Sequence, residues 1–310
     1  MSTHSILERL AEIRTSRIRA PLEVFELGQK LVESGWINKN SDQGWIVKEQ
    51  LAVAALECGQ LELASVLVDR LESEFPSKES QRILSLKGML LEGKGELDGA
   101  RRVYEQRLKE KETDTLIRKR LISLHLSVPL SPSSRSDGLS RQEGIRLLVS
   151  YLDTFYIDAE AWLLLSKSYS ELGFYEQALS AANHAVLLQP QNPFLLLWHA
   201  ELVYTIGGGD LELALKEFLR VVEMTTDLNE TGKERKLLGC GRRAAFGAKN
   251  CLNRLRTTIQ PSKSTTTTPA MTKEKLEQLE IMMTKLLLAS STTNTSGGVE
   301  LKVIREWLST

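Results

Sequence analysis

Residues 158–190 decide the fold, and they read DAEAWLLLSKSYSELGFYEQALSAANHAVLLQP. Trp162, Leu165 and Tyr169 are spaced three and four residues apart, so they share one face of a helix. A second stretch is rich in alanine and ends at Pro190, which cannot continue a helix. The segment therefore predicts two antiparallel helices whose backbones approach closely.

This spacing resembles the tetratricopeptide repeat, which reads W-x2-L-G-x2-Y, then A-x3-F, then P, over about 34 residues. Ser166 stands at the small glycine position, and Ala182 stands where the repeat usually has phenylalanine. The positions that match in this copy are Trp162, Leu165, Ser166, Tyr169, Gly173, Ala178, Ala182, Ala185 and Pro190. One match can arise by chance, so recurrence along the chain is the test.

Weaker copies recur on both sides of this one, and every insertion between them falls at a turn. The first copy has Leu51, Ala52, Ala55, Gly59, Ala64, Val68, Leu71 and Pro76, and the second has Gly88, Leu91, Gly95, Ala100 and Tyr104. The third is divided between Leu121, Ile122 and His125 and Gly144, Leu148 and Tyr151, with a loop at 129–138. The copy after Pro190 has Leu196, His199, Ala200, Ala214, Phe218 and Val221. A sixth copy would include Phe246 and Gly247 in a helix near 242–256. The sequence predicts an all-α solenoid of five to six helical hairpins with flanking helices.

The same pattern sets the expected domain limits. Residues 1–44 should hold N-terminal helices (Ile6–Arg19 and Pro21–Glu33) and a polar connector, and residues 45–256 the repeat solenoid. Residues 257–270 read as a flexible linker rich in threonine and serine, and residues 271–310 as C-terminal helices. We expect the helix at 271–289 to cap the solenoid, and a detachable helix that binds a partner is the alternative.

Composition limits the function classes. The 310 residues are 42% hydrophobic and include 40 acidic and 40 basic side chains, so bulk attraction to nucleic acid is not expected. No apolar run approaches the roughly 18–20 residues of a bilayer span, and three cysteines are too few for a disulfide framework. The sequence predicts a soluble, cytosolic protein, in which the sequons at Asn229 and Asn294 are chance occurrences.

The residues that catalysis would need are sparse. His4, His125, His184 and His199 lie far apart without metal-ligand spacing. Gly239–Ala244 matches the dinucleotide fingerprint, but the preceding KERKLL is unlike a buried strand. We therefore predict no catalytic, cofactor-binding or metal-binding residues, and no enzyme.

One segment carries an excess of positive charge, which could contact anionic headgroups or an acidic partner. Its residues include Lys233, Arg235, Lys236, Arg242 and Arg243. A solvated helix face is the favoured interpretation, because exposed lysine and arginine are common and the total charge balances.

A more specific resemblance covers residues 20–250 approximately. The chain resembles the family of subunit 2 of the endoplasmic reticulum membrane protein complex in the blocks around Trp45, in Glu160-Ala161-Trp162, and in Tyr204-Thr205-x-Gly207-Gly208. The resemblance implies a non-catalytic cytosolic scaffold, without a cofactor, at the cytosolic face of that membrane. It would organise the membrane-spanning subunits during insertion of transmembrane helices, including tail anchors. The implied partners are cytoplasmic parts of those subunits and a second soluble subunit.

A free tetratricopeptide adaptor or co-chaperone is the alternative. Repeats that bind the C-terminal carboxylates of chaperones have a lysine and, four residues later, an asparagine on the first helix of a hairpin. The corresponding pairs here are Glu49/Val53, Ser85/Met89, Leu163/Lys167 and Leu197/Glu201, and none has this combination.

Overall fold

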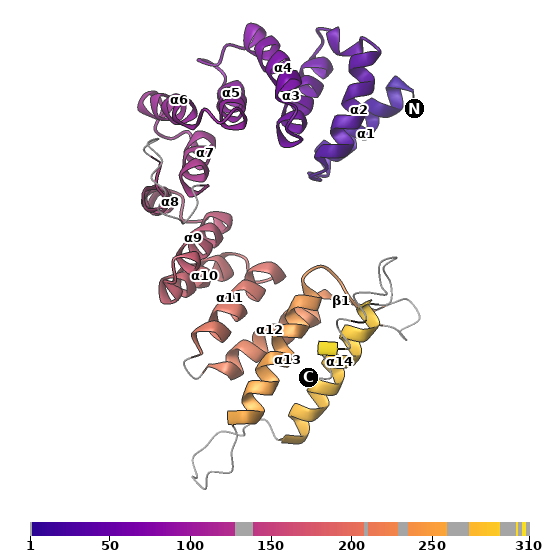
Figure 1. Cartoon of the computed structure of the whole chain (residues 1–310), viewed down its shortest axis with the longest axis vertical. Coiled ribbons are helices and arrows are strands. Elements are labelled where there is room, and N and C mark those ends of the chain that lie inside the picture. The colour runs from indigo at the N-terminus through magenta and orange to yellow at the C-terminus, as the bar shows by residue number, and fades with distance from the viewer. Residues whose placement is uncertain are drawn as a thin grey trace. The chain divides into compact units, whose positions relative to one another are not determined.

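The computed structural model describes residues 2–127, 139–207, 210–228, 235–258, 273–291, 302, 306 and 307. The chain divides into two compact units, Met1–Leu148 and Val149–Thr310. In the described residues of both units the architecture is helical hairpins, as the sequence predicts (Figure 1).

Unit 1 begins with a pair of flanking helices and continues with hairpins. Its elements are α1 (Thr3–Thr15), α2 (Pro21–Glu33), the short 3-10 helix η1 (Trp36–Asn38), α3 (Asp42–Glu57), α4 (Leu61–Glu74), α5 (Gln81–Gly93), α6 (Leu97–Glu110) and α7 (Thr115–Leu126). Helix α8 (Arg141–Thr154) contains the boundary between the units. A continuous core of aliphatic side chains, which includes Leu10, Leu31, Leu51 and Leu71, joins α1 to α5.

Unit 2 continues the same arrangement. Its elements are α9 (Ala159–Glu171), α10 (Tyr175–Leu188), α11 (Pro193–Ile206), α12 (Leu211–Thr225), strands β1 (Thr226–Leu228) and β2 (Arg235–Leu237), α13 (Gly241–Thr258) and α14 (Lys273–Ser291). Each helix from α9 to α14 packs against the next one along the chain (Figure 1). Phe218, Leu252, Met283 and Leu287 belong to one buried cluster that joins α12, α13 and α14.

In α3–α7 and α9–α12 the start of a helix depends on its place in the hairpin, whereas the second helix α8 is capped by Ser140, whose Oγ accepts a hydrogen bond from Glu143 N. First helices α3, α5, α7, α9 and α11 follow a side chain that accepts a hydrogen bond from the first-turn backbone, namely Ser41, Ser80, Asp114, Asp158 and Asn192. Second helices α4, α6, α10 and α12 have no such side-chain cap and instead carry Glu62, Asp98, Glu176 and Glu212 in the first turn. A carboxylate in the first turn interacts favourably with the positive end of the helix dipole. The local sequence therefore specifies both kinds of helix start.

Several local predictions need correction. The first helix spans Thr3–Thr15 rather than 6–19. Ser2 caps its N-terminus. The polar connector contains η1, and Gly44 lies inside α3 because Ser41 caps that helix. The sequence also missed the antiparallel pair of β1 and β2, in which Asp227 faces Lys236.

The domain limits at residues 44, 256 and 270 remain predictions. The loop at 129–138, residues 259–270 of the predicted linker, and the sequons at Asn229 and Asn294 lie outside the described residues, whereas Thr257 and Thr258 belong to α13. No helix in the described ranges is both long enough and apolar enough to cross a membrane.

Candidate interaction surfaces

The alanines of the repeat signature lie between the helices of each hairpin. All are buried, and they are Ala52, Ala64, Ala100, Ala178, Ala182 and Ala185. Their small side chains let neighbouring helices approach closely, so these positions build the scaffold and present no surface to a ligand.

The signature glycines and prolines mark turns and one close helix contact. Gly59, Gly95 and Gly173 have φ values of +73°, +79° and +81°, a conformation that other residues adopt at a cost. Gly88 instead lies within α5, where an added Cβ would overlap the ring of Tyr104. Pro76 and Pro190 come two residues after α4 and α10 end.

Trp162 is only partly buried in the strongest repeat. Its ring stacks on His184 with the centroids 4.4 Å apart, and its Nε1 donates to the carbonyl oxygen of Tyr156 at 2.8 Å. Leu165 is buried, and Tyr169 packs beside the cluster of Ala178 and Ala182. Trp162 therefore joins α9 to α10 at the edge of the hairpin.

Two polar clusters form hydrogen bonds between the helices α9 to α12 of unit 2. Ser166 Oγ donates to the carbonyl of Ala178 at 2.7 Å and accepts from Trp198 Nε1 at 2.8 Å. His199 Nδ1 lies 2.7 Å from Glu217, and its Nε2 lies 2.8 Å from the amide oxygen of Asn183. Buried polar groups need partners, and these two clusters bond side chains of α9–α12 to one another.

The basic patch stays a prediction, because only Arg242 and Arg243 of its five side chains are described. Lys233 lies outside the described residues, and the side chains of Arg235 and Lys236 are likewise not described. Arg243 Nη2 donates to Glu201 on α11 at 2.6 Å, so this charge holds two helices of unit 2 together. Arg242 also has an interaction partner.

The described residues offer little for catalysis. No three His, Cys, Asp or Glu side chains among them gather where a metal ion could bind. Burial raises the pKa of Cys240, and it raises the pKa of Cys251 to about 12, so both thiols stay protonated and weakly nucleophilic. His125 accepts a hydrogen bond from the backbone N–H of Ser140 and serves the junction of α7 and α8.

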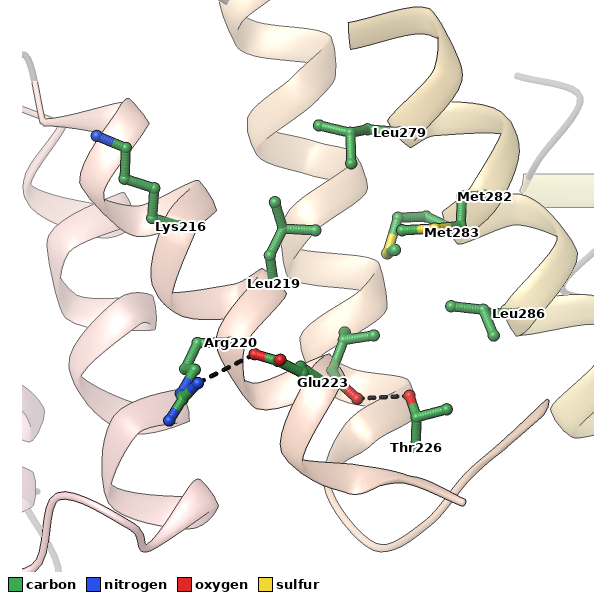
Figure 2. A pocket seen from close by; sticks show the side chains of 10 residues that line it. Lys216, Leu219, Arg220, Glu223, Thr226, Leu279, Met282, Met283 and Leu286 are labelled. Atoms are coloured by element: carbon green, nitrogen blue, oxygen red, sulfur yellow. Dashed lines mark hydrogen bonds and ion pairs between the residues drawn. The ribbon is translucent and has the colours of Figure 1, made fainter. Parts of the chain in front are cut away.

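An apolar groove of about 640 Å³ lies between α12 and α14. Figure 2 shows Leu219 on α12 and Leu279, Met283 and Leu286 on α14 around it. Arg220 pairs with Glu223 at 3.1 Å along one side. A second cavity, of about 390 Å³, lies in unit 1 beside α3.

Comparison with known proteins decides the family. A family model described as EMC2 TPR-like repeat domain matches residues 61–207. ER membrane protein complex subunit 2-A of Xenopus laevis is 31% identical over 218 residues, covering 70% of this chain and 69% of that protein. The chain belongs to the family of ER membrane protein complex subunit 2.

Other comparisons agree with this subunit 2 family and its fold. TPR repeat protein oca3 of Schizosaccharomyces pombe is 32% identical over 207 residues, covering 66% of this chain and 69% of that protein. A crystal structure of the C-terminal part of a TPR repeat-containing protein from Cytophaga hutchinsonii has a TM-score of 0.54 at 15% identity. That alignment covers 95% of this chain and 99% of the solved one, and it supports the tetratricopeptide fold alone.

Proposed function

We propose that this chain is a non-catalytic scaffold subunit of the endoplasmic reticulum membrane protein complex. It would lie at the cytosolic face and organise the membrane-spanning subunits that insert transmembrane helices. The observation that carries this proposal is the 31% identity over 218 residues with a protein named as subunit 2 of that complex. Its partners would be cytoplasmic parts of the membrane-spanning subunits and a second soluble subunit.

Exposed apolar side chains on unit 2 support a role in an assembly. Tyr156 and Ile157 lie in the turn between α8 and α9, Leu187 in the last turn of α10, and Phe194 in the first turn of α11. We name these four residues the turn edge. Ile157 is 72% exposed and Leu187 is 76% exposed. The turns adjoin because Ala159, Ala185 and Leu195, close to the turn edge in sequence, share one buried cluster. Grouped apolar side chains in water mark protein contacts.

Purification tests the proposal. The tagged chain, extracted from membranes with a mild detergent, should bring down integral membrane proteins in fixed proportion. Ile157→Asp with Leu187→Asp should reduce this recovery, whereas Arg102→Glu, at a side chain 75% exposed on α6, should not. Recovery of the chain without integral membrane proteins would overturn the proposal.

The two sequons allow a test of whether the chain lies on the cytosolic or the lumenal side of the membrane. Asn229-Glu-Thr231 and Asn294-Thr-Ser296 would be glycosylated in the lumen of the endoplasmic reticulum. We expect treatment with an endoglycosidase to leave the migration of the chain unchanged, and external protease to digest it in intact microsomes. Glycosylation, or protection from protease until detergent is added, would contradict a cytosolic location.

A further inference from the structure

The cavity in unit 1 has an apolar interior. Its volume is about 390 Å³, and it lies between the end of α1, the start of α2 and one face of α3. Ile13 and Val24 line it from α1 and α2, while Ile46 and Val53 line it from α3. The α3 residues are spaced seven apart and therefore share a face. A cavity of this size accepts one or two large side chains rather than a whole helix.

The rim of the cavity is positively charged. Four arginines and two glutamates line it. Arg19 Nε lies 3.4 Å from Glu57, and Arg82 Nε lies 2.8 Å from Glu49. Arg14 donates to the neutral amide oxygen of Gln50 at 3.0 Å. The described part of the chain gives Arg17 no carboxylate partner. Two positive charges are therefore left for a ligand.

The backbone at Arg17 adds a second observation. Arg17 has φ +52° and is the one non-glycine residue with positive φ among those described. The turn that contains Arg17 is closed by the same kind of hydrogen bond as a repeat turn. Ile18 N donates to the carbonyl of Ile13 at 3.1 Å, and in the repeat turn Gln60 N donates to the carbonyl of Ala55 at 2.8 Å. The repeat turn has Gly59 at the equivalent position. An arginine therefore occupies a conformation that favours glycine, and such strain gathers at functional sites.

We infer that this cavity binds an extended acidic peptide segment of a partner. A bulky apolar side chain of the peptide enters between α1 and α3, and a neighbouring carboxylate is held by Arg14 and Arg17. Arginine favours this pairing because its planar guanidinium donates two parallel hydrogen bonds to a carboxylate. The inference names a partner chemistry for the proposed scaffold and therefore rests on the proposed function.

Selection of peptides tests the inference. Random twelve-residue peptides displayed on phage are selected on the full chain, and enriched sequences are synthesised with a fluorescent label. We expect them to combine aspartate or glutamate with leucine, phenylalanine or tryptophan, and to bind more weakly as NaCl rises. Arg14→Glu with Arg17→Glu should weaken binding by about tenfold or more, since it converts attraction into repulsion. The control variant, Arg102→Glu, should bind as the wild type does.

Arg17→Gly separates binding from folding. Glycine relieves the left-handed backbone, so this variant should unfold at a higher temperature and yet bind the selected peptides several-fold more weakly. Selection that enriches no acidic peptides, or peptides that bind both arginine variants as tightly as the wild type, would overturn the inference. If the wild-type chain still recovers integral membrane proteins in that case, the proposed function stands alone. If peptides bind but no membrane protein is recovered, the proposed function fails instead.

Discussion

Ser166 has two structural roles in the repeat, one from its small size and one from the hydrogen bonds of its hydroxyl. The repeat needs a small side chain at this position because two helix backbones approach there. The hydroxyl also bonds the carbonyl of Ala178 and the indole of Trp198. The sequence indicates the small size from local spacing. It could not indicate the bond to Trp198, because that partner lies 32 residues away on another helix.

Trp162 should stabilise unit 2 by less than a fully buried tryptophan does. Because its ring is partly exposed, we expect Trp162→Ala to lower the free energy of unfolding by about 2–3 kcal/mol, below the roughly 3–5 kcal/mol of a core site. Trp162→Phe keeps an aromatic ring beside His184 but loses the hydrogen bond to Tyr156, and it should cost about 1 kcal/mol. Urea unfolding followed by circular dichroism measures both. Equal losses for the two variants would contradict this account.

Gly88 and Gly99 form a matched pair in unit 1. A Cβ at Gly88 would overlap the Tyr104 ring, and Tyr104 is held in place by a bond of 2.6 Å from its hydroxyl to Glu92. Gly88→Ala should therefore destabilise the fold by about 1–3 kcal/mol. A Cβ at Gly99 in α6 would meet nothing closer than 3.8 Å, so Gly99→Ala should stabilise by about 0.5–1 kcal/mol. Thermal unfolding compares them, and a change of the same sign in both would refute the prediction.

At the scale of elements, hydrophobic periodicity and capping residues predict the positions of most helices in unit 1 and unit 2. Asp158 and Asn192 stand before apolar stretches with helical spacing, and both prove to be helix caps. The strand pair β1 and β2 was missed because each strand has three residues, too few for alternation to emerge. The cavities could not be predicted either, since each collects side chains from helices that are distant in sequence.

The junction of α7 and α8 should lose stability as the pH falls. Burial lowers the pKa of His125 below 6.5, and Glu143, Arg101 and Glu105 are the charged groups that act on it. The unfolded chain therefore gains the proton first, and the folded state is destabilised between pH 6.5 and the lower pKa of the folded state. The slope cannot exceed about 1.4 kcal/mol per pH unit for one group.

Urea unfolding at pH 7.5 and pH 5.5 measures this effect. His125→Gln should show a smaller loss of stability on acidification than the wild type, because glutamine does not titrate in this range. His4→Gln is the control, since the His4 side chain is 84% exposed. An unchanged pH dependence in His125→Gln would show that His125 does not cause it.

At the scale of the whole molecule, the family match and the compact units do not coincide. The match covers 61–207, from the start of α4 to the end of α11, and therefore includes parts of both units. Helices α12, α13 and α14 lie beyond it, although they share a buried cluster with Leu197, Ala200 and Val203 of α11. Repeats derive their stability from neighbouring repeats, so the last hairpin contributes to the fold even where the family match has ended.

Loss of stability in one repeat should therefore be visible in the cell. We expect Trp162→Ala to lower the abundance of the chain several-fold, because a loss of about 2 kcal/mol increases the unfolded fraction that proteases remove. If the chain is a scaffold, its integral membrane partners should decline with it, while Trp162→Phe and Gly99→Ala should leave them near normal. Quantitative mass spectrometry of membranes, with messenger RNA measured in parallel, makes the comparison. Depleted chain with normal partners would argue against the scaffold role, and normal levels of both would argue that Trp162 does not limit stability in the cell.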